Sequence, residues 1–365
     1  MIIGVPRETK TDEFRIALKP AGAELLVRDG HRVLIEAGAG QGSGFSDDDF
    51  RRTGAVIVGD AERVFGEAEL LVKVKEPQPR EIELLTPRHT VFGYMHFAGS
   101  RELTERCLAA GFTAIAYETL ADPNGNLPLL TPMSEVAGRL SVQEGAKYLE
   151  RPFGGRGVLL GGVPGVDSAN VLVIGGGVVG SNAARMAAGL GAHVTLLDVN
   201  LGQLRYLSDV MPANVSCVYS DKHAIDAYLA QADLVIGAVL LPGRKAPKLI
   251  SKKQIATMQP GSVIVDVSID QGGCLETSEP TTHSKPTFVV DGVVHYCVAN
   301  MPAAVSRTST HALCNATLPY VRKLASLGSK AFVALDRGHA TALNMLGGKI
   351  VNHDVADAFE DLPRG

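Results

Sequence analysis

The chain has 365 residues, which is too long for one ordinary domain and suits two. Hydrophobic residues make up 45% and charged residues 20%, values typical of a folded α/β protein and not of a disordered chain. The formal net charge is −4 and no long basic run occurs, so the charge pattern does not attract nucleic acid or anionic lipid. No apolar run approaches the roughly 20 residues of a membrane span. Neither a nucleic-acid nor a membrane partner is therefore predicted.

The five cysteines are odd in number, widely spaced and without a Cys-x-x-Cys pair. A disulfide framework and a zinc site are therefore not expected, and we predict no metal. The N-terminal apolar stretch is too short for a signal peptide. Together these features predict a protein of the reducing cytoplasm.

In the first third of the chain, short runs rich in valine and isoleucine alternate with helical patterns. This alternation is typical of βαβ units, which build parallel sheets with helices on both faces. We predict strands at 2–5, 32–36, 70–75, 91–96 and 113–117, and helices at 20–28, 47–53 and 102–110.

A helical pattern at 134–149 leads into the glycine-rich segment 154–165, which is predicted to be an irregular loop. A second set of short apolar strands follows. From 309 to 327 the chain is again helical, and we expect these helices to pack on the first domain. The strands of the second set are predicted at 171–174, 194–198, 215–219, 234–238 and 263–267.

The predicted fold class is α/β, with two doubly wound parallel-sheet (Rossmann-like) domains and a cleft between them. The first domain is expected to be discontinuous and to comprise residues 1–130 plus 305–365, while the second spans 131–304. Such a chain crosses twice between the domains, and a cleft between domains is the usual place for a small ligand.

A glycine pattern in the second domain predicts a dinucleotide site. The apolar strand at 171–174 is followed by Gly175, Gly177 and Gly180 in the spacing Gly-x-Gly-x-x-Gly, and then by a helix of small residues. The first glycine permits the tight turn, the second lets the backbone reach a pyrophosphate, and the third allows close packing of helix and strand. The pyrophosphate then lies on the free N–H groups of the helix N-terminus.

Asp198 indicates which dinucleotide binds. It closes the next predicted strand, 23 residues after Gly175, near the roughly 20 residues expected for the carboxylate that binds the ribose. This carboxylate accepts a hydrogen bond from a 2′-hydroxyl but repels a 2′-phosphate, so NAD is favoured over NADP. We therefore predict that residues 131–304 form the NAD-binding domain and that the discontinuous domain binds substrate and carries the catalytic residues.

Two basic residues of the first domain are candidates for binding a substrate carboxylate. Arg15 lies in a polar loop before the first helix, where its guanidinium could pair with a carboxylate through two parallel hydrogen bonds. A solvated arginine is the alternative. Lys75 closes the predicted strand 70–75, and the two-residue alternation puts Lys73 on the same face. Two lysines on one face are more typical of an exposed surface than of a site.

His96 and Asp270 are the candidates for proton transfer. His96 ends the apolar run 91–96, and histidine exchanges protons near neutral pH, with a buried core histidine as the alternative. Asp270 follows the predicted strand 263–267, and an acid at the carboxyl end of such a strand faces the nicotinamide side of a dinucleotide crevice. Asp266 lies inside that strand and is interpreted as structural.

With these segments in view, the chain resembles the alanine dehydrogenase family, within the alanine dehydrogenase/transhydrogenase N-terminal superfamily, over essentially its full length. The resemblance implies reversible oxidative deamination of L-alanine by NAD to pyruvate and ammonium, with hydride transfer to nicotinamide followed by hydrolysis of the imine. It also implies a homohexamer. The segments that carry it are 4–8 with Arg15, 73–77, 93–96, 157–180, 266–273 and 295–302.

The same resemblance implies roles for individual residues. Arg15 and Lys75 hold the substrate, while His96 and Asp270 form the acid/base pair. The residues implied for the NAD site, together with the three glycines of the turn, are Ser134, Gly175, Gly177, Val178, Val179, Gly180, Asp198, Ser220, Val239, Leu240, Val267, Ser268, Ile269, Asp270, Val298, Ala299, Asn300 and Met301.

Gln203 and Glu279 depart from the family pattern, which favours basic residues touching the cofactor at these positions. An acid at 279 is expected to weaken dinucleotide binding electrostatically. The alternative function is an NAD(H)-binding soluble subunit of a proton-translocating transhydrogenase. A noncatalytic NAD sensor and a dehydrogenase for glycine or an opine-like substrate are further possibilities, and the joint presence of Arg15, Lys75, His96 and Asp270 argues against the sensor.

Overall fold

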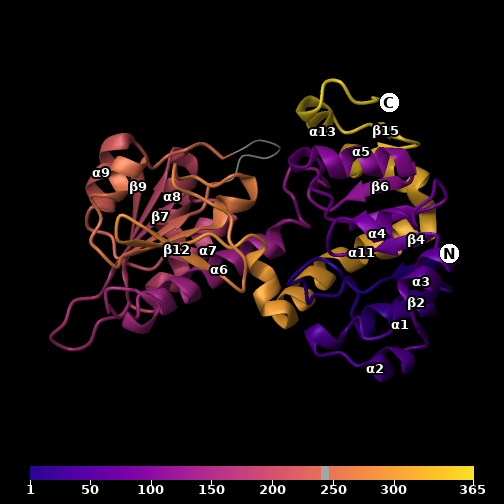
Figure 1. The fold of residues 1–365 in the computed structure, drawn as a ribbon, viewed down its shortest axis with the longest axis horizontal. Coiled ribbons are helices and arrows are strands. Elements are labelled where there is room, and N and C mark those ends of the chain that lie inside the picture. The colour runs from indigo at the N-terminus through magenta and orange to yellow at the C-terminus, as the bar shows by residue number, and fades with distance from the viewer. Residues whose placement is uncertain (240–245) are drawn as a thin grey trace. The chain divides into compact units, whose positions relative to one another are not determined.

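The computed structural model of the chain describes residues 1–239 and 246–365. It divides into two compact units, one formed by Met1–Met133 with Ala303–Gly365 and the other by Ser134–Pro302 (Figure 1). Each unit contains a mostly parallel sheet flanked by helices, which confirms the predicted α/β class. Leu240, predicted to line the cofactor site, lies outside the described residues.

The first unit is built on an eight-stranded sheet with the order β15-β14-β6-β5-β4-β1-β2-β3. The six strands from β6 to β3 run parallel, while β14 is antiparallel to β6 and β15 is antiparallel to β14. The carboxyl ends of β6, β5, β4 and β1 therefore meet at one edge of the sheet. The strands are β1 (Ile2–Val5), β2 (Arg32–Glu36), β3 (Val56–Val58), β4 (Leu70–Val72), β5 (Thr90–Gly93), β6 (Thr113–Ala116), β14 (Leu343–Leu346) and β15 (Lys349–Ile350).

Helices cover both faces of this sheet. On one face, residues of α3 and α5 such as Phe65 and Cys107 share a core cluster with Leu71 and Val91 of the sheet. On the other, Phe332 of α11 contacts Phe92 of β5, with ring centroids 6.2 Å apart. The helices of this unit are α1 (Pro20–Arg28), α2 (Asp47–Arg51), α3 (Ala61–Glu67), α4 (Pro79–Ile82), α5 (Arg101–Ala110), α11 (Ser306–Val333), α12 (Arg337–Thr341) and α13 (His353–Ala358).

Two strands of the first unit end three residues before their predicted ends. The predicted strand 70–75 ends at Val72, and the predicted strand 91–96 ends at Gly93. Two backbone hydrogen bonds still join the segments just past these ends, from Lys73 N to the Phe92 carbonyl at 3.0 Å and from Tyr94 N to the Val74 carbonyl at 3.1 Å. The N–H groups of Val74 and His96 bond to glutamate side chains instead. The prediction that Lys73 and Lys75 share one strand face is therefore wrong.

The second unit is built on a seven-stranded sheet with the order β12-β13-β11-β10-β7-β8-β9. All of its strands are parallel except β12, which pairs antiparallel with β13. The order reverses between β7 and β10, and in open sheets of this kind a ligand binds at that switch point, at the carboxyl ends of the strands. The strands are β7 (Asn170–Ile174), β8 (His193–Asp198), β9 (Val215–Tyr219), β10 (Leu234–Gly237), β11 (Val263–Asp266), β12 (Thr287–Val290) and β13 (Val293–Tyr296).

The helices of the second unit connect these strands and include the long helix that leads into it. Ile225 and Leu229 of α9 and Ile255 of α10 pack with Leu172 and Ile264 of the sheet. Among the described residues, no helix is both long and apolar enough to cross a membrane, and no cluster of three or more potential metal ligands occurs. The helices are α6 (Thr131–Tyr148), α7 (Val178–Gly189), α8 (Leu201–Val210), α9 (Lys222–Leu229) and α10 (Lys252–Ile255).

Candidate active site

The glycine turn of the second unit has the geometry that the motif requires. Gly175 follows β7 with a φ of 103°, a conformation that side chains with a Cβ rarely adopt. A Cβ on Gly180 would lie 1.7 Å from the Gly175 carbonyl oxygen, so only glycine lets α7 approach the strand this closely. A Cβ on Gly177 would meet no protein atom within 4 Å, which leaves space beside the start of α7. The turn therefore fits a pyrophosphate at the helix N-terminus.

Asp198 is held in place beside this turn by two backbone N–H groups. Its Oδ2 accepts from Gly176 N at 2.6 Å and its Oδ1 accepts from Asn200 N at 2.7 Å. Gln203 also holds the turn, because its Nε2 donates to the Gly176 carbonyl at 2.7 Å. The glutamine that departs from the family pattern thus has a structural role at the turn.

Among the other predicted cofactor residues that the structure describes, Ser134 is on α6, Val178 and Val179 begin α7, and the rest lie just beyond the carboxyl ends of strands. Ser220 directly follows β9, Val239 follows β10, and residues 298–301 follow β13. Residues 267–270 follow β11 in the 3₁₀ helix η4 (Val267–Gln271).

Asp266 organises the loop that carries Asp270. It is buried and accepts hydrogen bonds from Ser268 N at 3.0 Å, from Cys274 N at 2.9 Å and from Ser278 Oγ at 2.5 Å. Desolvation raises the pKa of Asp266, and these hydrogen bonds oppose the rise. Asp270 itself is exposed and accepts from Asn300 N at 3.3 Å. The structural interpretation of Asp266 agrees with these contacts.

In the first unit, four neighbouring strands deliver polar residues to one sheet edge. Glu8 follows β1, Lys75 follows β4, His96 follows β5 and Glu118 follows β6. Because β6, β5, β4 and β1 are adjacent and parallel, these residues emerge side by side.

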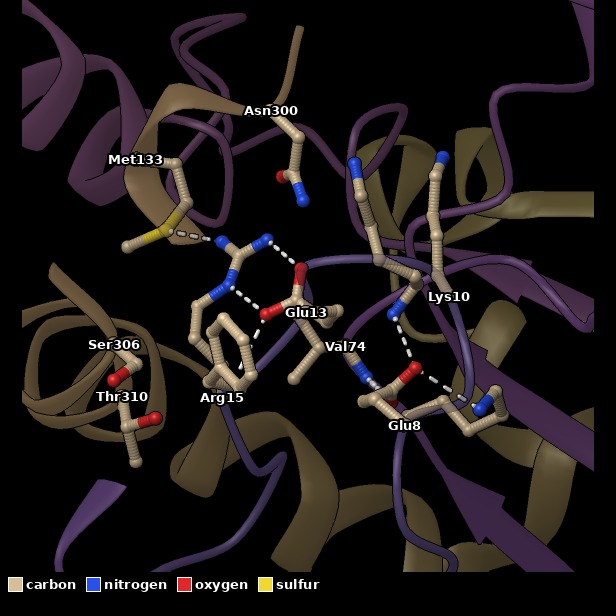
Figure 2. A network of polar contacts seen from close by, with 12 residues as sticks. Glu8, Lys10, Glu13, Arg15, Val74, Met133, Asn300, Ser306 and Thr310 are labelled. Atoms are coloured by element: carbon tan, nitrogen blue, oxygen red, sulfur yellow. Dashed lines mark hydrogen bonds and ion pairs between the residues drawn. The ribbon is translucent and has the colours of Figure 1, made fainter. Parts of the chain in front are cut away.

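Arg15 is buried, so the alternative interpretation of a solvated arginine is wrong. Its Nε and Nη2 donate to the two carboxylate oxygens of Glu13 at 2.7 and 2.5 Å, and its Nη1 lies 3.0 Å from the sulfur of Met133. Figure 2 shows Glu13 and Met133 on different sides of the guanidinium. The side chains of Arg15 and Glu13 are 2% and 0% exposed. Glu13 thus fixes the plane of the guanidinium and uses one of its paired N–H edges.

Lys73 and Lys75 are also buried, which overturns the exposed-face interpretation. Lys73 Nζ donates to Glu8 at 3.0 Å and to Glu81 at 2.8 Å, so it is part of a buried ionic cluster. Glu8 also accepts from the backbone N–H of Val74 at 2.6 Å (Figure 2) and of Lys75 at 3.4 Å. The cluster therefore anchors the segment from which the Lys75 side chain extends.

Lys75, His96 and Tyr94 lie together. Lys75 Nζ is 3.5 Å from His96 Nε2, and the Tyr94 ring stacks on the imidazole with centroids 5.7 Å apart and planes 9° apart. Tyr94 is itself fixed, because its hydroxyl donates to the Leu129 carbonyl at 2.6 Å.

The pKa of His96 is lowered, first by desolvation from the surrounding protein atoms and then by the positive charge of Lys75. The charge of Arg15 contributes in the same direction, which places Arg15 in the same electrostatic environment. The residue is nevertheless exposed, so water screens part of both effects. The imidazole is therefore neutral near pH 7, and this is the form that accepts a proton.

The sequence patterns did not predict a role in the site for five residues that the structure places there, which are Glu8, Glu13, Tyr94, Glu118 and Met133. The rule that found Lys75 and His96, a polar residue at the carboxyl end of a predicted strand, applies equally to Glu8 and Glu118. Glu13 and Met133 carried no such signal, because the first pairs within an irregular loop and the second reaches Arg15 from a distant segment. Asp270 belongs to the second unit, so its pairing with His96 stays a prediction.

Two family models together match nearly the whole chain. The model of the N-terminal domain of alanine dehydrogenase/PNT matches residues 4–137, and that of the C-terminal domain matches residues 141–353. The chain belongs to the alanine dehydrogenase/PNT family. The resemblance seen in the sequence motifs is thereby confirmed.

Relatives within the alanine dehydrogenase/PNT family match over almost their full length. Alanine dehydrogenase of Halomonas elongata is 54% identical over 359 residues, which cover 98% of this chain and 97% of the relative. That of Bacillus subtilis is 50% identical, covering 98% of this chain and 94% of the relative. A solved L-alanine dehydrogenase is 52% identical, with a TM-score of 0.95 and 99% of each chain covered.

A transhydrogenase from Sinorhizobium meliloti also resembles the chain in structure. Its TM-score is 0.82, its identity is 24%, and the match covers 97% of this chain and 99% of that one. At this identity the similarity is one of fold alone.

Proposed function

We propose that the chain is an NAD-dependent amino-acid dehydrogenase that converts L-alanine reversibly to pyruvate and ammonium. Relatives that are 54% and 50% identical over nearly the full chain are alanine dehydrogenases. The observation that carries the proposal is the cluster of Lys75 and His96 at the ends of β4 and β5, with Arg15 in the same electrostatic environment. An oxidation of this kind needs a cation for the carboxylate and a neutral base for the amine or water proton.

Arg15 binds the substrate carboxylate in this proposal. Its Nε and Nη2 pair with Glu13, and the substrate carboxylate pairs with the same guanidinium. Because Glu13 fixes the guanidinium plane, the carboxylate is oriented as well as attracted, and positioning of this sort lowers a barrier by up to about 7–11 kcal/mol. Lys75 lies beside His96 and either holds the carboxylate or polarises the carbonyl of pyruvate.

His96 is the proton carrier. Its lowered pKa keeps the imidazole neutral, so a ring nitrogen accepts a proton from the water that attacks the imine and returns it in the opposite direction. Asp270, from the second unit, orients that water and stabilises the positive nitrogen. General acid–base help of this kind contributes typically about 10²–10⁴-fold in rate.

The second unit fits NAD. The Gly175 turn leaves its backbone open at Gly177, and the Asp198 carboxylate, held by two N–H groups, would accept from a ribose 2′-hydroxyl and repel a 2′-phosphate. When bound, NAD would be the oxidant, because it would accept the hydride from the substrate Cα. The residues that the resemblance implies for the NAD site include Ser134, Ser220, Val239, Asp270 and those at 298–301.

We further propose a homohexamer located in the cytoplasm. The sequence resemblance supports self-association, as do exposed apolar side chains on the glycine-rich segment, where Leu159 is 67%, Val163 53% and Val166 65% exposed. Light scattering on the purified protein measures the assembly directly. A monomeric mass would contradict the hexamer without affecting the proposed reaction.

Steady-state kinetics test the proposed reaction. The absorbance of NADH is followed with L-alanine plus NAD and with pyruvate, ammonium and NADH, alongside glycine and NADP controls. Turnover with alanine in both directions supports the proposal. Tight NADH binding without turnover contradicts it and favours an NAD(H)-binding transhydrogenase subunit.

A further inference from the structure

His96 has a backbone conformation that is uncommon for a residue with a Cβ. Its φ is 50° and its ψ is 32°, in the left-handed region. This conformation costs roughly 1–2 kcal/mol for a typical residue with a Cβ, and histidine adopts it more often than most, so interactions that stabilise this backbone decide whether it is kept. Strain of this kind clusters at functional sites, so the groups that enforce it matter for the direction of the side chain.

The carboxylate of Glu118 accepts hydrogen bonds from this backbone. Its Oε1 accepts from the N–H of His96 at 2.6 Å and from the N–H of Met95 at 3.1 Å, and its Oε2 lies 3.2 Å from the same Met95 nitrogen. Hydrogen bonds from N–H groups to a carboxylate are stronger than neutral ones. The N–H groups of Met95 and His96, which lie beyond the end of β5, therefore both donate to the Glu118 side chain.

The sheet brings Glu118 to this position. Strands β5 and β6 pair in parallel, with Gly93 opposite Ala116, so Glu118 extends past the end of β6 beside the point where β5 has just ended. Desolvation raises the pKa of Glu118, and the N–H groups of His96 and Met95 oppose that rise because they stabilise the carboxylate. The carboxylate and the turn therefore stabilise one another.

Other residues restrain the imidazole but not the backbone that carries it. The Tyr94 ring stacks on its face, and Lys75 lies 3.5 Å from its Nε2. Neither contact sets the direction of the Cα–Cβ bond, which follows from the left-handed φ and ψ. The hydrogen bonds of Glu118 act on that backbone and not on the imidazole.

We propose that Glu118 is a positioning residue, which holds His96 in its left-handed conformation and thereby directs the imidazole toward the proton it transfers. The inference rests on the proposed function, in which His96 carries the proton. It predicts that loss of Glu118 slows catalysis more than it weakens binding of substrate or cofactor.

The first test compares Glu118→Ala and Glu118→Gln with the wild-type protein. Glu69→Gln is a matched control, because Glu69 also accepts a backbone N–H, that of Ile2 at 2.6 Å, at an exposed place outside the site. Misplacing a reacting group by about 1 Å costs on the order of 100-fold, so Glu118→Ala should lower kcat roughly 10- to 100-fold. The amide oxygen of Glu118→Gln still accepts one N–H, so its loss should be smaller.

Binding is measured on the same variants. The KM for alanine and the Kd for NADH should each stay within about threefold of wild type, since Glu118 contacts neither Arg15 nor the glycine turn in the described hydrogen bonds. Glu69→Gln should match wild type in kcat and in binding. A kcat within about threefold of wild type for Glu118→Ala overturns the inference. So does a loss confined to KM or to NADH affinity.

A double-mutant cycle separates positioning from general stability. If Glu118 acts through His96, then Glu118→Ala should add little to the loss already caused by His96→Ala. A purely structural role predicts equal losses in both backgrounds and overturns the inference. If Glu118→Ala does not fold, the cycle is run with Glu118→Gln. A wild-type protein without alanine turnover refutes the proposed function itself, whereas full activity in His96→Ala refutes only the role given to His96 and Glu118.

Discussion

Replacing Arg15 with lysine separates the role of the guanidinium from that of its charge. Arg15 pairs with Glu13 through Nε and Nη2, and its Nη1 lies 3.0 Å from the Met133 sulfur, so the planar guanidinium that is proposed to pair with the substrate is held in a fixed orientation. An ammonium keeps the charge but cannot make both sets of paired hydrogen bonds in one plane. A charge-assisted hydrogen bond contributes about 1.5–3 kcal/mol, and the loss of one to the substrate corresponds to roughly 10- to 150-fold in kcat/KM.

Folding should suffer less than catalysis in this variant. Removing one partner of a buried ion pair costs about 3–5 kcal/mol, but lysine leaves the buried Glu13 carboxylate with a cation. We therefore expect a smaller loss of stability, measured by thermal unfolding, alongside the loss in kcat/KM for alanine. Arg7→Lys is the matched control, because the Arg7 side chain is 61% exposed and its carboxylate partner is 3.9 Å away. An unchanged kcat/KM for Arg15→Lys would remove Arg15 from substrate binding.

Two further substitutions probe the glycine turn and the proton carrier. Gly180→Ala places a Cβ 1.7 Å from the Gly175 carbonyl oxygen, so calorimetric titration should detect a loss of NADH binding. Gly189→Ala in the same helix is the control, because no atom of the described residues, apart from its chain neighbours and its own helix backbone, lies within 4 Å of its new Cβ, and it should bind NADH normally. Equal binding by both would show that the turn does not hold the dinucleotide. Lys75→Met removes a positive charge that lowers the pKa of His96, so that pKa should rise, as followed by NMR titration of the imidazole. Lys10→Met is the control and should raise the pKa of His96 less. If Lys75→Met leaves the pKa of His96 unchanged, Lys75 does not lower that pKa electrostatically.

The strand and helix pattern was predictable because apolar periodicity and glycine spacing are local signals. The helix at 20–28 and the strands at 2–5, 32–36 and 215–219 appear with the predicted bounds. The ends of β4 and β5 were not predictable, because the strand-like pattern continues past them, whereas the N–H groups of Val74 and His96 bond to glutamates that are distant in the chain. Short strands such as β3 and β14 lacked a pattern long enough to identify them.

Some features of the site also follow from local sequence signals, whereas others depend on contacts between distant residues. Lys75 and His96 follow strands, so the rule about strand ends finds them from sequence. Burial of Arg15 was not predictable, because it depends on Glu13 in the same irregular loop and on Met133 more than a hundred residues away in the chain. The orientation of His96 depends on a left-handed backbone that apolar periodicity does not reveal.

The decisive measurement of the proposed reaction is NADH formation by the purified protein with L-alanine and NAD, paired with NADH consumption by pyruvate and ammonium. We expect turnover in both directions, a strong preference for NAD over NADP because of the Asp198 carboxylate, and a large loss of rate in His96→Ala. Binding of NADH without turnover of alanine or pyruvate would contradict the proposed reaction.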